Sequence, residues 1–134
     1  FDAAYAKFNE TLNKVNAEQS KKQIEKLKKD GKKGYAAAME STLRLTTLVD
    51  NLEKAPQKAD KAAVEKELSE IEALLKSINN DRGQVLADRY NSVVGDVRQV
   101  LADPSDNNLN NMIEGFNGYI DTYNSTTPDQ FDAK

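Results

Sequence analysis

Apolar residues recur along this 134-residue chain at alternating intervals of four and three. This spacing places side chains on one stripe of an α-helix, the stripe that packs against neighbouring helices. The clearest stripes are Val64, Leu68, Ile71, Leu75 and Ile78, then Leu86, Tyr90, Val93, Val97 and Val100, then Leu109, Ile113, Phe116, Ile120 and Tyr123. The pattern predicts an all-α fold, an elongated antiparallel helical bundle of four to five helices.

Capping residues and helix breakers predict where these helices begin and end. We expect helices over residues 2–29, 35–54, 61–78, 84–102 and 105–123. Gly31 and Gly34 mark the first turn, Pro56 ends the second helix and Asp60 caps the third. The stretch 79–83 reads as a break, and its alternative is one uninterrupted helix over 61–102.

The first helix and the end of the chain depart from the regular pattern. The first stripe falters over residues 16–20 and resumes out of phase at Ile24 and Leu27. Either this helix bends there, or its distal half leaves the bundle. Residues 124–134 contain Pro128, many small polar residues and no stripe. We therefore expect one helical-bundle domain over 1–123 and a polar tail or linker over 124–134.

The composition argues against catalysis. The chain has no histidine, cysteine or tryptophan, so the usual zinc, copper and haem sites have no ligands here. No histidine is present to activate a serine or threonine hydroxyl. The densest carboxylates, Glu65, Glu67, Glu70 and Glu72, alternate with lysines, which is typical of a solvated helix face. We expect no enzyme activity, no cofactor and no metal site.

Positive charge gathers in one short stretch. Residues 21–33 hold seven lysines against Glu25 and Asp30, a local charge of +5 in a chain whose net charge is −3. Lys28, Lys29, Lys32 and Lys33 are our candidate contacts for an anionic polymer, while a solvated helix end is the plainer interpretation. Nucleic acid is not expected, since no arginine falls in the run and Tyr35 is the only aromatic residue nearby.

A second candidate surface lies in the stretch 115–124. Tyrosine and asparagine make adaptable contacts, so Tyr119, Tyr123 and Asn124 are candidate contacts for a protein or a glycan. The plainer interpretation is close helix packing at the glycines, with the tyrosines at the edge of the core.

Two segments resemble known helical modules of Gram-positive bacteria. The run from Arg89-Tyr90-Asn91 to Tyr123-Asn124, closing in FNGYIDTYN, resembles the C-terminal part of cell-wall-binding lipoproteins. The segment VLADPSDNNLNNMIEGFNGYID is similar to FIVAR-type three-helix modules of surface adhesins. Either resemblance implies an extracytoplasmic module at the bacterial cell surface or in the cell envelope, with a binding or scaffolding role.

The expected function is non-catalytic binding or scaffolding within a bacterial surface protein or lipoprotein. Its partner would be a host protein or a cell-envelope polymer, and membrane proximity would come from an anchor outside this chain. One alternative is the ligand-sensor domain of a membrane protein, whose bundle passes a helix shift to a membrane segment. Another is an intracellular adaptor or assembly protein whose helices complete a partner's bundle.

Overall fold

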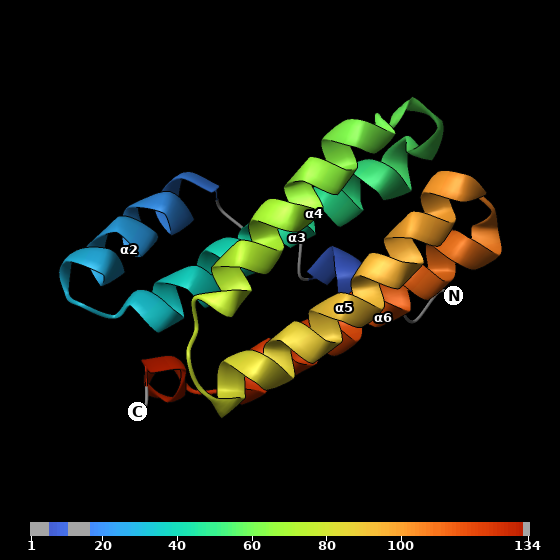
Figure 1. Ribbon diagram of the computed structural model, residues 1–134. Coiled ribbons are helices and arrows are strands. Elements are labelled where there is room, and N and C mark those ends of the chain that lie inside the picture. Colours follow the sequence, from blue (N-terminus) through green and yellow to red (C-terminus); the bar gives the residue numbers. More distant parts are fainter. Residues whose placement is uncertain (1–5, 11–16, 133–134) are drawn as a thin grey trace.

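The computed structural model describes residues 6–10 and 17–132 (Figure 1). Within these ranges every regular element is helical, which confirms the predicted all-α class. The elements are α2 (Ala17–Lys29), α3 (Lys33–Lys54), the 3-10 turn η1 (Pro56–Lys58), α4 (Lys61–Lys76), α5 (Asp81–Ala102), α6 (Asp106–Ser125) and the 3-10 turn η2 (Pro128–Asp132). Residues 6–10 are also helical, and the middle of the predicted first helix, 11–16, lies outside the described residues.

Helix α3 is the central element of an antiparallel bundle. It contacts α2, α4, α5 and α6, and α5 and α6 form a long hairpin beside it (Figure 1). Helix α2 packs mainly on the first half of α3, where it buries Ile24. The distal half of the predicted first helix is therefore packed against the bundle.

The core consists of the apolar stripes predicted from the sequence, which face the interior of the bundle. Leu45, Val49 and Leu52 of α3 meet the stripes of α4, α5 and α6, and all three of those stripes are largely buried. Phe8, from the short helical stretch 6–10, is completely buried and sets its ring edge-on to Phe116, with centroids 5.6 Å apart. The first residues described thus contribute an aromatic anchor to the core.

Local signals set the helix ends as predicted. The Asp60 carboxylate accepts hydrogen bonds from the N–H groups of Ala62 and Ala63, at 3.0 and 3.5 Å, and so caps α4. Ser105 caps α6 in the same way. Helix α3 ends at Lys54, just before the residue that precedes Pro56.

The break between the third and fourth predicted helices exists, which rules out one rod over 61–102. Helix α4 ends at Lys76 and α5 begins at Asp81, three residues before the predicted start. The side-chain oxygen of Asn80 accepts a hydrogen bond from the Gly83 N–H at 3.0 Å and caps α5. Arg82 and Gly83 therefore lie in the first turn of the helix, and the predicted break was placed too late.

The turn from α2 to α3 is closed by a residue in the left-handed conformation. Gly31 has φ +82°, and the next N–H, of Lys32, donates to the Leu27 carbonyl at 2.9 Å. Glycine reaches this conformation without steric strain. The turn brings the lysines at the end of α2 next to those that open α3.

The end of the described chain is packed, contrary to the tail that we predicted. Phe131 of η2 is 2% exposed, between the rings of Tyr35 and Tyr123, with centroids 6.1 and 6.0 Å away. We call the segment Pro128–Asp132 the C-terminal clasp. The apolar periodicity does not predict this segment, because a single aromatic residue makes no periodic pattern.

Polar contacts hold the C-terminal clasp on the start of α3. The Asp132 carboxylate accepts hydrogen bonds from the N–H groups of Gly34 and Tyr35, at 2.7 and 3.1 Å. The Asn80 side-chain amide donates to the Gln130 and Phe131 carbonyls, at 3.1 and 2.9 Å. A carboxylate from a distant segment therefore caps a helix whose own flanking residue, Lys32, makes no side-chain cap.

Candidate functional site

The main candidate site is the concentration of lysines where α2 turns into α3. We call this set the basic corner: Lys21, Lys22, Lys26, Lys28, Lys29, Lys32 and Lys33, all exposed. Its position follows from the sequence of α2, in which Ile24 is buried and Leu27 partly buried, while all five lysines of the helix lie at exposed positions. The four predicted polymer contacts, Lys28, Lys29, Lys32 and Lys33, all fall within it.

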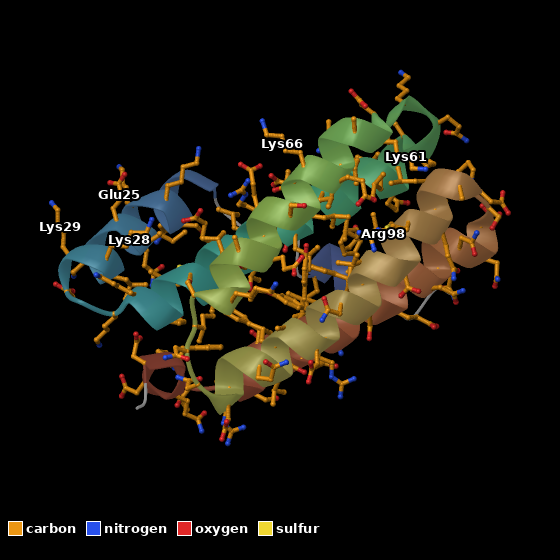
Figure 2. The ribbon with its side chains drawn as sticks, in the orientation of Figure 1. Glu25, Lys28, Lys29, Lys61, Lys66 and Arg98 are labelled. Carbon is orange, nitrogen blue, oxygen red and sulfur yellow. The ribbon has the colours of Figure 1, made fainter. Side chains whose placement is uncertain are left out.

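The basic corner has more positive than negative charge, although the Asp132 carboxylate of the C-terminal clasp lies beside it at Gly34. Glu25 and Asp30 are the acidic residues of the stretch 21–33, which leaves a charge of +5 there. Lys28 pairs with Glu40 of α3 at 3.4 Å. No other ion pair is formed by the lysines of this corner with the described part of the chain. Figure 2 shows the Lys29 and Glu25 side chains extending away from the bundle.

A shallow groove separates α2 from α3 beside these lysines. It has a volume of about 410 Å³ and an apolar floor of Ile24 and Leu43. Lys21, Lys28 and Arg44 stand among its lining residues. Sequence reasoning missed Ile24 and Leu43 as parts of a site, because it left open whether the distal half of the first helix packs on the bundle at all. The groove offers an apolar strip flanked by charged side chains of both signs, since Glu25 and Glu40 also line it.

A network of ion pairs ties this groove to the rest of the bundle. Arg44 donates hydrogen bonds to Glu67 of α4, with its Nε 3.1 Å from Oε2, and lies 3.3 Å from Glu70. It also lies 3.7 Å from Glu40, which pairs with Lys28. The hydrogen bond to Glu67 raises the pKa of Arg44. The network joins α2, α3 and α4 and fixes the edge of the corner.

Of the three residues of the second predicted surface, Tyr119 is buried. Tyr119 has no exposed surface, and its hydroxyl lies 3.0 Å from that of Thr42. Tyr123 is half-buried against Phe131, and only Asn124 is exposed. Burial raises the pKa of both tyrosines. The prediction of a tyrosine recognition face is therefore wrong for Tyr119, because α6 turns this side chain toward α3 rather than toward solvent.

The described residues show no arrangement suited to metal chemistry or membrane crossing. They hold no group of three or more His, Cys, Asp or Glu side chains that is placed to bind a metal ion. None of their helices is both long enough and apolar enough to cross a membrane. What the basic corner presents is a concentration of positive charge, which attracts anions.

Comparison with known proteins adds no relative. No protein-family model, curated protein or solved structure matches this chain significantly. The resemblances to Gram-positive surface modules therefore stay predictions.

Proposed function

We propose that this chain is a non-catalytic binding module of a bacterial surface protein or lipoprotein. Its basic corner holds an anionic polymer of the cell envelope. The observation that carries the proposal is the cluster of seven exposed lysines, of which Lys28 alone pairs with a carboxylate among the residues described. The surface location rests on the resemblance of residues 89–124 to Gram-positive lipoproteins.

The chemistry of the corner favours a flexible polyanion over nucleic acid. Lysine is a compact, hydrated charge that attracts phosphate without demanding a fixed geometry, whereas arginine recognises planar groups through two parallel hydrogen bonds. The positively charged residues of the corner are all lysines. Its neighbouring aromatic residue, Tyr35, stacks on Phe131 and is therefore not free to stack on a base. A phosphate-rich envelope polymer needs neither arginine nor a stacking platform.

The geometry also favours a polymer over a host protein as the partner. Protein recognition sites are usually centred on aromatic residues or arginines. The tyrosines predicted for that role are buried or half-buried. The basic corner offers charge spread along a helix and a turn, which suits a chain of repeated anionic units.

The proposal is tested by charge reversal with a matched control. The triple variant K26E/K29E/K32E changes three exposed lysines of the corner and spares Lys28, which pairs with Glu40. The control K58E/K61E/K66E makes the same change of charge at three exposed lysines elsewhere. Figure 2 shows Lys61 and Lys66 on α4, away from Lys28 and Lys29. Binding of each variant to purified teichoic acid is measured by calorimetry, with a neutral envelope polysaccharide as the negative ligand.

We expect the corner variant to lose about a hundredfold in affinity, since each lysine near an anionic surface contributes about 1 kcal/mol. The control variant should lose much less. Wild-type binding should also weaken between about 0.1 and 1 M salt, where the screening length falls from about 10 to 3 Å. Equal losses in both variants would show that net charge, and not this corner, governs binding.

The cellular location needs its own experiment. Intact source cells are treated with protease and probed with an antibody against this domain. Loss of the signal would support a surface position. A protected signal in the cytoplasmic fraction would contradict the proposal and favour the adaptor alternative.

A further inference from the structure

A second surface feature is a groove between α5 and α6. Its volume is about 440 Å³, and its lining includes Arg82, Val85 and Arg89 from α5 and Gly118 and Thr122 from α6. The two helices lie side by side along their lengths (Figure 1). None of these residues belongs to the basic corner, so the groove is a separate surface.

The first wall of the groove carries two available arginines in an acidic part of the molecule. Residues 81–132 hold nine carboxylates and three arginines, a net charge of −6. Arg98 is bound by Glu65 of α4, with Nη2 and Oε1 3.0 Å apart. Arg82 and Arg89 form no ion pair with any residue that the structure describes. Their guanidinium groups are therefore free to take carboxylates in the two-pronged geometry that arginine favours.

One apolar side chain, Val85, lines the groove. Val85 is 45% exposed, and no other large apolar side chain among the described residues is classed as exposed. Gly118 also lines the groove, and an added Cβ atom there would meet no atom outside its own stretch of helix within 4 Å. A glycine in a helix interior costs about 1 kcal/mol relative to alanine, and close packing does not explain this one. Its missing side chain leaves room for an apolar group of a ligand.

The second wall accepts hydrogen bonds and does not donate them. The hydroxyls of Thr122 and Ser125 donate to the carbonyls of Gly118 and Asp121, at 3.1 and 2.7 Å. Thr126 donates in the same way to the Thr122 carbonyl at 2.9 Å. Their hydrogens are thus in use, and their oxygens remain as acceptors. The Asp121 carboxylate on this wall is paired with Lys7 at 2.7 Å.

We infer that this groove docks an acidic amphipathic helix of a protein partner. Arg82 and Arg89 are seven residues apart, about 10 Å along α5, which matches two carboxylates seven residues apart on another helix. An apolar residue between those carboxylates reaches Val85 and the space over Gly118. Amide or ammonium donors on its other edge meet the hydroxyl oxygens. A phosphate polymer fits less well, because it would bring negative charge against the acceptor wall and Asp121.

The inference is tested by nuclear magnetic resonance titration of the whole isotope-labelled chain. The probe is an alanine-based helical peptide with two glutamates seven residues apart, leucine between them and lysines on the other edge of the same face. Saturable shifts are expected at the amides of Val85, Gly118 and Thr122. A peptide with glutamine in place of both glutamates should bind about tenfold more weakly or worse, because the charge-assisted hydrogen bonds are lost.

Two pairs of variants separate the groove from general effects. R82Q/R89Q should weaken peptide binding about tenfold or more, whereas K61Q/K66Q, with the same change of charge on α4, should leave it unchanged. Gly118→Leu should block the groove, whereas Gly95→Leu, at an exposed glycine with equally free space, should not. Leucine forms helix better than glycine, so both variants should keep or raise the melting temperature. Loss of binding in Gly118→Leu is then not a loss of folding.

Three results would overturn the inference. The first is the absence of saturable shifts at millimolar peptide, or shifts located outside the groove. The second is inorganic polyphosphate binding at Arg82 and Arg89 as tightly as the peptide does, which would make the groove a simple anion site. The third is a dimer in analytical ultracentrifugation that the peptide dissociates, which would make the groove a contact between two copies of the chain.

Discussion

Replacing Phe131 with alanine tests whether the C-terminal clasp belongs to the folded unit. The side chain is 2% exposed and lies between two aromatic rings at about 6 Å. Truncating a buried phenylalanine to alanine typically costs about 3–5 kcal/mol, from lost transfer free energy and the remaining cavity. The half-buried neighbours Tyr35 and Tyr123 can partly close over the gap, so we expect the lower end, about 3 kcal/mol.

This loss is measured by urea unfolding followed by circular dichroism. For a chain of this size the melting temperature should fall by about 12 °C, at about 4 °C per kcal/mol. Amide hydrogen exchange should accelerate at Gly34 and Tyr35, because their N–H groups donate to Asp132 of the clasp. Val85→Ala is the control, since an exposed position should change stability by no more than about 0.5 kcal/mol.

A loss below about 1 kcal/mol in Phe131→Ala, with unchanged exchange at Gly34, would refute this reasoning. It would mean that residues 128–132 behave in solution as the polar tail that the hydrophobic pattern predicts. A large loss of stability with unchanged exchange at Gly34 would support the aromatic packing of Phe131. It would contradict the cap that the Asp132 carboxylate makes on α3.

Three further predictions concern single residues. Burial raises the pKa of Asp96, so as pH rises the carboxyl ionises first in the unfolded state, and the free energy of unfolding falls as pH rises through the raised pKa. Asp96→Asn should reduce that fall and be the more stable form at pH 7. Urea unfolding at acid and neutral pH measures both effects. Gly34→Ala should loosen the clasp, because its Cβ would lie 2.1 Å from the Phe131 carbonyl oxygen; the melting temperature should drop, and amide exchange should accelerate at Phe131. Tyr90→Phe removes the hydroxyl that donates to the Leu68 carbonyl and should cost about 0.5–1.5 kcal/mol in urea unfolding.

Helix ends could be predicted from the sequence where the responsible group lies within a few residues. Asp60 caps α4 through N–H groups two and three positions later, and Pro56 acts on the residue directly before it. The sequence predicts the start of α5 three residues late, because Asn80 reads as part of a break, whereas its side chain caps the helix. Such short-range signals carry most of the information that a single sequence offers about helix boundaries.

Contacts between distant segments could not be predicted in this way. Phe131 is buried because Tyr35 and Tyr123 lie beside it, and no residue near Phe131 in the sequence indicates these contacts. Tyr119 faces the core because of how α6 is rotated against α3, and the apolar stripe alone does not decide this for an amphipathic side chain. The surroundings of both residues follow only from the assembled bundle.

The two candidate surfaces differ in the same respect. The basic corner could be predicted directly, because its lysines lie within thirteen consecutive residues and a charged residue on a short helix stays exposed. The groove between α5 and α6 could not, because Arg82 was placed in a predicted loop and its opposite wall comes from residues about 40 positions later. Only the hairpin brings these two sets of side chains together.

The separation of charge along the bundle gives this molecule a large electric dipole moment. Its positive pole is the lysine-rich turn from α2 to α3, while the hairpin of α5 and α6, residues 81–125, carries a net charge of −4. The turn that joins α5 to α6 lies at the opposite end of the bundle from the lysine-rich turn (Figure 1). Close to a negatively charged cell surface such a molecule experiences a torque that turns its lysines toward that surface and the far end of its hairpin away from it. Its orientation is therefore selected before contact, and low salt should speed its arrival as well as tighten its hold.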